Sequence, residues 1–365
     1  MTERLDRRTF IRRGALGAAG VAFLGSPLLA ACSSDKKATT AASGASGASS
    51  AAASFGSMDF QCSWIKNVEF AGEYIADTNG YYKDAGFSTV NLITGGPGIN
   101  QDSVVDSGKA FIGTSDPTIT APAILSGANI IVVGAQYQKS PFAIMSLKSN
   151  PIPTPQAMKG KKIGVQPTNE AIWNAYLSAA GIDPSTVTKV SVGFDTSELV
   201  AGAVDGWFSF ITNEPNELKA KGIETVTFLL AETGLPLVSQ HYIVNKKALA
   251  DNRPRIKAAL LAEVKGWRDS LKTPATGAHL AATKYGVDLK LDEAEQTNES
   301  IDQNKLILTD DTKANGIFTI TDAHVTETLA SLAKAGTVIT KDKLFDLSLI
   351  NEIYAEHPEL KTPPS

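Results

Sequence analysis

The chain is poor in the residues that most catalytic and metal sites need. It has two cysteines and four histidines in 365 residues, and no histidine stands at metal-ligand spacing from another histidine or a cysteine. The sequence also lacks the GxxxxGK[ST] phosphate-binding loop and the GxSxG nucleophile elbow. Spacing alone leaves a Ser/His/Asp arrangement open, but nothing points to one. We therefore expect a binding protein, not an enzyme, with no catalytic residue, no metal and no cofactor.

Cysteine is too scarce for an internal disulfide. Cys32 stands at a predicted processing site, which leaves Cys62 alone in the part that folds. Cys62 alternates with Phe60 and Trp64 in a predicted strand, so we expect a buried small side chain rather than a reactive thiol.

Apolar runs long enough to cross a membrane are lacking after the N-terminal segment. Residues 7–12, Arg-Arg-Thr-Phe-Ile-Arg, form a twin-arginine pattern, and residues 14–31 are nearly uncharged. A basic region, an apolar region and a small-residue cleavage site together predict an export signal over residues 1–31. Cys32 follows Leu-Ala-Ala and resembles the cysteine of a bacterial lipobox, which is acylated. An N-terminal membrane anchor with an ordinary cysteine is the alternative.

Residues 33–57 consist almost entirely of Ala, Ser, Gly and Thr. Such a segment has too few apolar side chains to offset the entropy of ordering, so we expect a disordered tether over residues 32–57. Several acyl chains on Cys32 would anchor it stably in a lipid membrane. The mature protein is thus predicted to be an exported lipoprotein at the outer face of the cytoplasmic membrane.

Positive charge is scarce in the mature part. Without residues 1–31, 29 lysines and arginines remain against 36 acidic residues, a net charge of −7. This balance argues against nucleic acid as a partner. The arginines that remain are Arg253, Arg255 and Arg268, all in one predicted helix. We therefore expect no arginine clamp for a carboxylate, sulfonate or phosphate in a ligand site, although Lys66 or backbone amides could hold a small oxyanion.

Residues 58–365 are long enough for two lobes with sizeable cores, and their pattern is α/β. Short β-like runs alternate with amphipathic helical stretches, which indicates a mostly parallel sheet covered by helices. The pattern restarts after the proline-rich residues 151–155. From residue 253 onward the sequence is mainly helical, and we expect these helices to pack back on the first lobe. The predicted strands lie at 60–64, 88–93, 111–114, 129–134, 161–165, 207–211 and 225–230, and the predicted helices include 70–83, 169–180, 254–272, 275–285, 292–306 and 322–335.

Ligands of open α/β sheets bind outside the carboxyl ends of the strands. The loops at these positions carry aromatic, amide and carboxylate side chains, among them Trp64, Glu69, Trp173 and Glu214. Each has a structural alternative, because the tryptophans could be core residues and the acids could be solvated or act as helix N-terminal charges. The adjacent glycines 95 and 96 would let backbone N–H groups approach a ligand, or they could form a plain turn.

Five stretches of the folded part carry a pattern that is found in a known family. They are Trp64…Asn67…Glu69-Phe70-Ala71-Gly72-Glu73-Tyr74…Gly80-Tyr81-Tyr82…Gly86, then Gly95-Gly96-Pro97-Gly98…Ser107-Gly108-Lys109-Ala110-Phe111-Ile112-Gly113, Gln136-Tyr137-Gln138, Gly193-Phe194-Asp195 and Asn213-Glu214-Pro215. These motifs resemble those of the thiamine-pyrimidine-precursor-binding group of ABC-importer substrate-binding proteins. The resemblance runs from about residue 60 to about 245, and the helical tail fits in length only. Riboflavin-, nitrate-, sulfonate- and taurine-binding relatives share much of the same frame.

The resemblance implies a two-lobed, type II periplasmic-binding-protein fold that closes on its ligand around two hinge crossovers. By analogy the crossovers lie near residues 140–147 and 239–245, lobe 1 comprises residues 58–142 and 243–365, and lobe 2 comprises residues 143–242. In such proteins an aromatic side chain stacks on the ligand ring, while acids and amides hold its amino groups. The implied ligand-binding residues are Trp64, Asn67, Glu69, Gly95, Gly96, Asp116, Gln138, Asn169, Trp173 and Glu214.

Acids and tryptophans at the predicted mouth favour a flat, neutral or cationic, nitrogen-rich ligand such as a thiamine pyrimidine precursor. The implied partners are that small molecule and the permease and ATPase subunits of an importer, with the protein itself a monomer. Nitrate, sulfonate, taurine or riboflavin binding is the alternative within the superfamily. Two alternatives of other classes are a pyrimidine-synthase-like enzyme, which would need a histidine in the cleft, and a lipid-tethered sensor.

Overall fold

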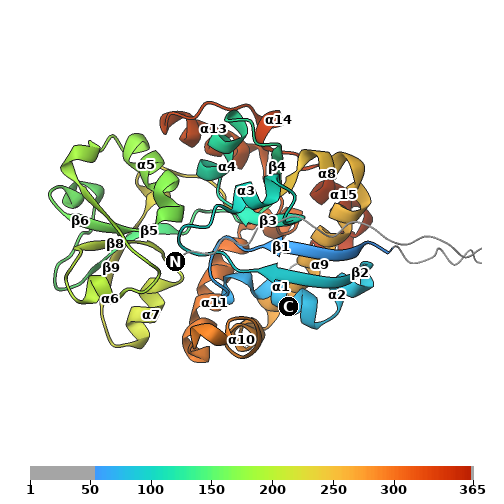
Figure 1. The fold of residues 1–365 in the computed structure, drawn as a ribbon, viewed down its shortest axis with the longest axis horizontal. Helices are drawn as coiled ribbons and strands as arrows, with labels where there is room; N and C mark the ends of the chain where they lie inside the picture. Colours follow the sequence, from blue (N-terminus) through green and yellow to red (C-terminus); the bar gives the residue numbers. More distant parts are fainter. Residues whose placement is uncertain (1–53, 363–365) are drawn as a thin grey trace, which may run out of the picture. The chain divides into compact units, whose positions relative to one another are not determined.

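The computed structural model of the protein describes residues 54–362, and within them two five-stranded sheets (Figure 1). Residues 1–31, Cys32 and most of the predicted tether lie outside the described residues. Sheet A has the strand order β2-β1-β3-β10-β4, and sheet B has the order β7-β6-β8-β5-β9. Sheet A consists of β1 (Gly56–Gln61), β2 (Phe87–Ile93), β3 (Ile112–Ser115), β4 (Ile130–Tyr137) and β10 (Ser239–Asn245). Sheet B consists of β5 (Phe142–Leu147), β6 (Lys162–Val165), β7 (Thr188–Ser191), β8 (Gly206–Phe210) and β9 (Thr225–Leu229).

The two sheets repeat one pattern of pairing. In sheet A, β1 pairs in parallel with β2 and β3, while β10 runs antiparallel between β3 and β4. In sheet B, β6 pairs in parallel with β7 and β8, while β5 runs antiparallel between β8 and β9. We call the parts built on sheets A and B lobe 1 and lobe 2. In each lobe the antiparallel strand is the one that arrives from the other lobe.

Two segments connect the lobes. The chain leaves β4 and enters β5 through residues 138–141, and it returns from β9 to β10 through residues 230–238. The ranges 140–147 and 239–245, expected as crossovers, consist mostly of β5 and β10, each of which pairs within a single sheet. Because β10 belongs to sheet A from Ser239 on, the chain is back in lobe 1 four residues before the expected boundary.

The helices alternate with the parallel strands as the sequence predicts. Lobe 1 contains α1 (Ala71–Thr78), α2 (Tyr81–Asp84), α3 (Gln101–Asp106) and α4 (Pro117–Leu125), and lobe 2 contains α5 (Glu170–Ala179), α6 (Ser197–Val200) and α7 (Glu214–Ala220). The C-terminal helices are α8 (Lys246–Asp251), α9 (Arg253–Lys272), α10 (Pro274–Leu280), α11 (Glu293–Ile307), α12 (Asp310–Asn315), α13 (Asp322–Lys334), α14 (Lys341–Leu344) and α15 (Ser348–Glu356). None of the described helices is both long and apolar enough to cross a membrane.

The first βα unit differs in detail from its prediction. The first strand ends at Gln61, so Cys62 and Trp64 lie in the loop after it, and Gly56 and Ser57, expected in the tether, begin the strand. Phe55 just before it packs on Phe87 with a ring separation of 5.5 Å, which extends the ordered part toward the N-terminus. The helix expected at 70–83 is divided in two by Gly80, whose φ of 80° a helix cannot contain.

The main core of lobe 1 lies between sheet A and the C-terminal helices. Helix α9 crosses α1 so closely that a Cβ atom on Gly266 would lie 2.1 Å from the carbonyl oxygen of Gly72. A Cβ atom on Gly72 would in turn lie 2.2 Å from the ring of Trp267, which is fully buried. The two glycines therefore let the helix backbones touch, and the expectation that the C-terminal helices pack on lobe 1 is confirmed.

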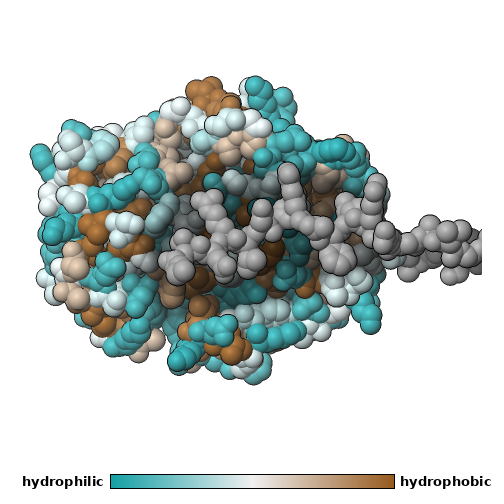
Figure 2. All heavy atoms as spheres, viewed as in Figure 1, coloured by the Kyte–Doolittle hydropathy of each residue, from teal (hydrophilic) through white to brown (hydrophobic). Residues whose placement is uncertain are grey.

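The two lobes contact each other on both sides of their junction. Thr168 of lobe 2 donates a hydrogen bond to the carbonyl of Ile99 (2.9 Å), and Asn216 at α7 donates one to Asp302 on α11 (2.9 Å). The structure therefore shows the lobes in a closed arrangement. On the face drawn in Figure 2, hydrophobic residues form separate patches among hydrophilic ones.

Candidate functional site

A cavity lies between the lobes at the carboxyl ends of the central strands, with about 490 Å³ of space including its mouth. About 40 Å³ of this space is open to a water-sized sphere. The loops after β1 and β3 and the start of β10 supply the wall from lobe 1. The loops after β6 and β8 and the start of β5 supply the wall from lobe 2. The lining residues are Ser63, Trp64, Glu69, Gln101, Ser115, Asp116, Ile119, Phe142, Thr168, Asn169, Ile172, Phe208, Ser209, Phe210, Asn213, Glu214, Ser239 and Gln240.

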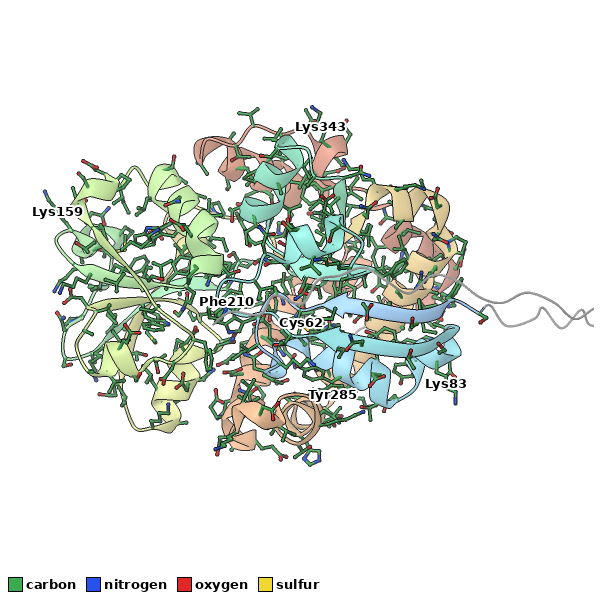
Figure 3. The ribbon with its side chains drawn as sticks, in the orientation of Figure 1. Cys62, Lys83, Lys159, Phe210, Tyr285 and Lys343 are labelled. Carbon is green, nitrogen blue, oxygen red and sulfur yellow. The ribbon has the colours of Figure 1, made fainter. Side chains whose placement is uncertain are left out.

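Aromatic rings form the apolar part of this wall. Phe142 and Phe210 meet edge to face with a ring separation of 4.4 Å, and Phe142 also packs on Phe208 at 5.2 Å. In Figure 3, Phe210 lies where the two lobes meet, and Cys62 lies in the loop after β1. Trp64 is partly buried and faces the same cavity from lobe 1. A flat ring is the ligand shape that such surfaces bind best, because stacking adds to the burial of apolar area.

Glu69 sits at the centre of the polar part of the wall. Its carboxylate accepts hydrogen bonds from Gln240 (2.7 Å), from the hydroxyl of Ser63 (3.2 Å) and from Asn213 of lobe 2 (3.5 Å). Burial raises the pKa of Glu69 to about 7, and these hydrogen bonds oppose the shift only in part. Glu69 therefore links the two lobes and titrates near neutral pH.

Glu214 occupies the N-terminus of α7 in lobe 2. Its Oε2 accepts a hydrogen bond from the backbone N–H of Phe210 (2.9 Å), which fixes the side chain against the end of β8. Burial raises the pKa of Glu214 to about 8, and the negative charges of Glu217 and Glu69 add to the shift. The site thus holds two carboxyl groups from opposite lobes, both buried and both able to change charge near neutral pH.

Gln240 holds Glu69 at the cost of backbone strain. Its φ is 48°, a left-handed conformation that is rare for residues other than glycine, and it lies at the start of β10. The side chain donates to Glu69 and accepts from Ser63 (3.0 Å). Strained backbone that positions a polar side chain is typical of ligand sites.

Asp116 lines the cavity but its carboxylate already has partners. Oδ1 accepts from the backbone N–H and the hydroxyl of Thr118, so Asp116 caps the N-terminus of α4. Oδ2 accepts from Ser239 (2.8 Å). Nearby, Asp102 accepts a hydrogen bond from Ser115, and burial raises the pKa of Asp102 to about 6. Asp116 therefore shapes the wall and joins α4 to β10.

A second cavity lies beyond Trp64, with about 1290 Å³ of space including a wide mouth. Trp64, Asn213 and Glu214 line both cavities, so they form the wall between them. The rest of its lining comes from the loop after β1, from Phe194, Asp195 and α7 of lobe 2, and from residues 289–299. In Figure 1, α11 lies beside the junction of the lobes, and its residues Glu295 and Glu299 face this second space.

Most of the predicted ligand-binding residues lie around these two cavities. Trp64, Glu69, Asp116, Asn169 and Glu214 line the first, and Trp64, Glu214 and Asn67 line the second. The side chain of Asn67 accepts a hydrogen bond from the backbone N–H of Glu69 (3.2 Å) and caps the short helix Val68–Phe70.

The structure places four other predicted residues outside both linings. Gly95 passes so close to the chain at residues 62–64 that a Cβ atom would lie 2.5 Å from the carbonyl of Cys62, and its N–H is bonded to the carbonyl of Trp64 (2.9 Å). Gly96 follows with a φ of 136°. Trp173 is buried in the core of lobe 2 against Phe208, and Gln138 lies at the link between the lobes, where its side chain meets His324 (3.2 Å).

Several lining residues carried too weak a signal in the sequence to be chosen. Phe142, Phe208 and Phe210 belong to strands β5 and β8 and read as ordinary core residues. Gln240 stands within a predicted crossover, and only its backbone angle marks it. Asn213 and Thr168 follow strands and Ser115 ends β3, each directly beside a residue that was chosen.

The charge of the first cavity has one sign. Glu69, Asp116 and Glu214 are its ionisable residues, and neither lysine, arginine nor histidine is among the residues that line it. His241, the histidine nearest in sequence, is fully buried in β10 and bonds Thr120 (2.9 Å), and burial lowers its pKa to about 3. The lining offers hydrogen-bond acceptors and aromatic faces, which suit amino groups and flat rings better than an oxyanion.

Comparison with known proteins identifies the family of this chain. The family described as "NMT1/THI5 like" matches residues 67–277, more than half of the chain. The chain belongs to this family. Its two-lobed architecture is the periplasmic-binding-protein fold. A ligand-binding component of an ABC-type import system from Staphylococcus aureus has a similar structure, with a TM-score of 0.61 at 11% identity over 81% of this chain and 98% of that one.

Two curated relatives of this NMT1/THI5-like chain differ in kind. The riboflavin-binding protein RibY of Chloroflexus aurantiacus is 27% identical over 254 residues, which cover 68% of this chain and 72% of that protein. The 4-amino-5-hydroxymethyl-2-methylpyrimidine phosphate synthase of Legionella pneumophila is 24% identical over 166 residues, which cover 45% of this chain and 52% of the enzyme. The match to the enzyme therefore spans about half of its length.

Proposed function

We propose that this protein is the substrate-binding component of an ABC importer, which captures a flat, nitrogen-rich heteroaromatic such as a thiamine pyrimidine precursor and delivers it to a permease. The observation that carries the proposal is the first cavity, which combines aromatic walls with carboxylates from both lobes and has no basic residue in its lining. Amino groups on a ring would donate to Glu69 and Glu214, while Trp64 would stack on its face.

The proposal includes the way the protein is held and moves. Residues 1–31 would direct export, acylated Cys32 would anchor the chain in the outer face of the cytoplasmic membrane, and residues 32–57 would act as the tether. Closure of the lobes on the ligand would present a surface that permease subunits recognise. Family membership and the similarity to a riboflavin-binding protein support a binding role.

Titration calorimetry with 4-amino-5-hydroxymethyl-2-methylpyrimidine, riboflavin, taurine and nitrate tests the ligand class. We expect one of the two heteroaromatics to bind and both oxyanion-type ligands to fail. Stacking contributes roughly 0.5–1.5 kcal/mol beyond area burial, so Trp64→Ala should weaken binding about ten-fold once the lost area is added. Leu125→Ala, at a residue that is 50% exposed and outside both cavities, is the matched control. If only taurine or nitrate bound, the proposal would be wrong, and the alternative, a binding protein for an oxyanion, would be favoured.

The pyrimidine synthase among the relatives defines the alternative of another class. An enzyme of this kind would need a histidine in the cleft. No histidine of the described part of the chain lines the first cavity, and His241 is buried within β10, where its Nε2 bonds Thr120. Incubation of the protein with pyridoxal phosphate and iron in air, followed by mass spectrometry of the protein and of the small molecules, separates a carrier from an enzyme. Recovery of protein and pyridoxal phosphate unchanged is expected of a carrier, whereas a histidine that loses mass while an aminopyrimidine phosphate forms would indicate the enzyme.

A further inference from the structure

The hydroxyl groups that line the first cavity give their protons to acceptors within the protein. The side chains in question are Ser63, Ser115, Thr168, Ser209 and Ser239. Their acceptors are, in the same order, the side chains of Glu69 and Gln240, the carboxylate of Asp102, the carbonyl of Ile99, the carbonyl of Ala143 and the carboxylate of Asp116. A hydroxyl has one proton and two lone pairs, so each of these groups can meet a ligand only as an acceptor.

The direction of this hydrogen bond is fixed most firmly at Ser115. Its hydroxyl donates to Oδ1 of Asp102 and accepts from the side-chain amide of Gln101 (3.3 Å). Asp102 lies on α3, is 2% exposed and is not among the residues that line the cavity. Burial raises the pKa of Asp102 to about 6, so at pH 8 its carboxyl group is ionised and has no proton to donate. The shared proton therefore belongs to Ser115, and the lone pair that remains on Ser115 is left for the ligand.

The same arrangement recurs at Ser239. Its hydroxyl donates to Oδ2 of Asp116 (2.8 Å), while Oδ1 of that carboxylate is occupied by Thr118. Ser115 ends β3 and Ser239 begins β10, which pairs with β3 in sheet A. The wall from lobe 1 thus contains two serines on adjacent strands, each with a carboxylate that takes its proton.

The amide side chains of the lining are engaged as well. Gln101, Asn169, Asn213 and Gln240 each donate an N–H to an acceptor of the protein. Each amide has one further N–H, whereas the hydroxyl groups have lone pairs alone to offer. A ring carbonyl, which can only accept, therefore finds few donors in this cavity, and an amino group finds many acceptors.

We propose that Asp102 is a positioning residue for ligand specificity, which keeps the hydroxyl of Ser115 as an acceptor toward the ligand and so favours a ring with an amino group over the same ring with an oxo group. This inference rests on the proposed function and chooses between its two candidate rings. The pyrimidine precursor carries an amino group, whereas the pyrimidine part of riboflavin carries two carbonyl groups. The aminopyrimidine is then the expected ligand of the two.

Calorimetry with the wild-type protein at pH 8 tests the selection itself. The matched ligands are 4-amino-5-hydroxymethyl-2-methylpyrimidine and its 4-oxo counterpart, with riboflavin as a third. The oxo compound puts an acceptor where the amino compound has a donor, and a buried acceptor that faces another acceptor stays unpaired. We therefore expect the oxo compound to bind at least about ten-fold more weakly than the amino compound.

Two variants assign the selection to Asp102. Asp102→Ala removes the acceptor of the Ser115 proton, which can then turn toward the ligand, so the ratio of the affinities for the amino and oxo rings should fall about ten-fold. Ser115→Ala should lower the ratio as well, and Asp102→Ala should then have no further effect on it. Ser103→Ala is the matched control, because Ser103 is exposed on the same helix and lines neither cavity. Damage to the fold would weaken both rings and leave their ratio unchanged.

The outcomes distinguish this inference from the function on which it rests. An unchanged ratio in Asp102→Ala, or the same fall with and without the Ser115 hydroxyl, would overturn the role of Asp102 and leave the heteroaromatic importer intact. Tighter binding of riboflavin or of the oxo compound to the wild type would do the same. Failure of every ring to bind would overturn both. Circular dichroism checks each variant, and if Asp102→Ala does not fold, an unchanged ratio in Ser115→Ala would still contradict the inference.

Discussion

Glu69 and Glu214 are two carboxyl groups that the closed lobes bring to one cavity and that burial keeps largely protonated at slightly acidic pH. The pKa of Glu69 is about 7 and that of Glu214 is about 8, both raised by loss of solvent. Their charge, and with it their strength as acceptors, therefore rises across the neutral range. A hydrogen bond to an ionised acceptor is about twice as strong as one between neutral groups.

This titration predicts how binding depends on pH. Affinity for an uncharged aminopyrimidine should rise about ten-fold between pH 6 and pH 9, because the carboxyl groups lose their protons through that range. Glu214→Gln should remove the part of the rise centred near pH 8 and keep the part near pH 7. Glu170→Gln, an acidic residue at the first position of α5 that lines neither cavity, should keep the whole profile. An affinity that falls with rising pH would indicate an anionic ligand instead.

The sequence predicted some residues of the site and missed others. Side chains in loops after strands, such as Trp64, Glu69 and Glu214, could be chosen because strand ends converge in α/β folds. Trp173 followed the same rule but lies on the buried face of α5, which only the packing of lobe 2 determines. Gln240 could not be found, since its role depends on a φ of 48° that no sequence pattern displays. Cys62 was predicted to be buried, and the structure confirms it.

The crossing of α1 and α9 is the element-scale feature on which lobe 1 depends. Glu73 on α1 and Glu263 on α9 are both fully buried at this crossing, where Tyr242 donates to Glu73 (2.9 Å) and Tyr82 donates to Glu263. Burial raises the pKa of both carboxyl groups, and the repulsion between them adds to the shift of Glu263. The two helices approach each other closely because Gly72 and Gly266 carry no side chains.

Gly266→Ala tests the crossing. In an exposed helix this substitution would stabilise by roughly 1 kcal/mol, whereas here the added methyl group would overlap the carbonyl of Gly72. We expect a net loss of at least about 2 kcal/mol in the free energy of unfolding, measured by urea denaturation. Gly193→Ala is the control, because a Cβ atom there would meet no atom within 4 Å, and it should leave stability nearly unchanged. Equal stability of the two variants would show that the helices can separate without cost.

The presence of helices and strands was easier to predict than the residues at which they begin and end. The alternation of apolar runs indicated the parallel strands and the helices between them, and the glycines after α2 and α5 marked where those helices stop. The first strand was placed four residues late, because Phe60, Cys62 and Trp64 alternate as a strand does while Gly56 to Asp59 resemble a linker. The break at Gly80 was missed because the apolar stripe continues through Tyr81 and Tyr82.

The closed arrangement of the lobes is the feature of the whole molecule that binding should change. The lobes contact each other through polar pairs, such as Thr168 with Ile99 and Asn216 with Asp302, and through apolar pairs such as the rings of Tyr137 and Phe210 (6.4 Å). A ligand that also bridges the lobes is expected to shift the population toward the closed form. Small-angle X-ray scattering should show a smaller radius of gyration at saturating ligand than without it. An unchanged radius would argue against a hinge.

The Cys32→Ala variant tests the lipid anchor. We expect this variant to leave the membrane fraction, and it can then serve as the protein sample for the scattering experiment. Continued sedimentation of the variant with membranes would contradict the lipid anchor.

The antiparallel strand β10 has a consequence for how the protein is made. Every strand of sheet B comes from residues 142–229, one continuous stretch, whereas sheet A gains β10, between β3 and β4, only after that stretch has been synthesised. The half of the molecule that begins first on the ribosome is therefore completed last, and the inserted half has all its strands while its host still has a gap between two of them. Nascent chains usually fold from the N-terminus onward. Here the order of maturation is reversed, and the unfinished sheet edges at β3 and β4 are exposed to other chains for the time that translation of about a hundred residues takes.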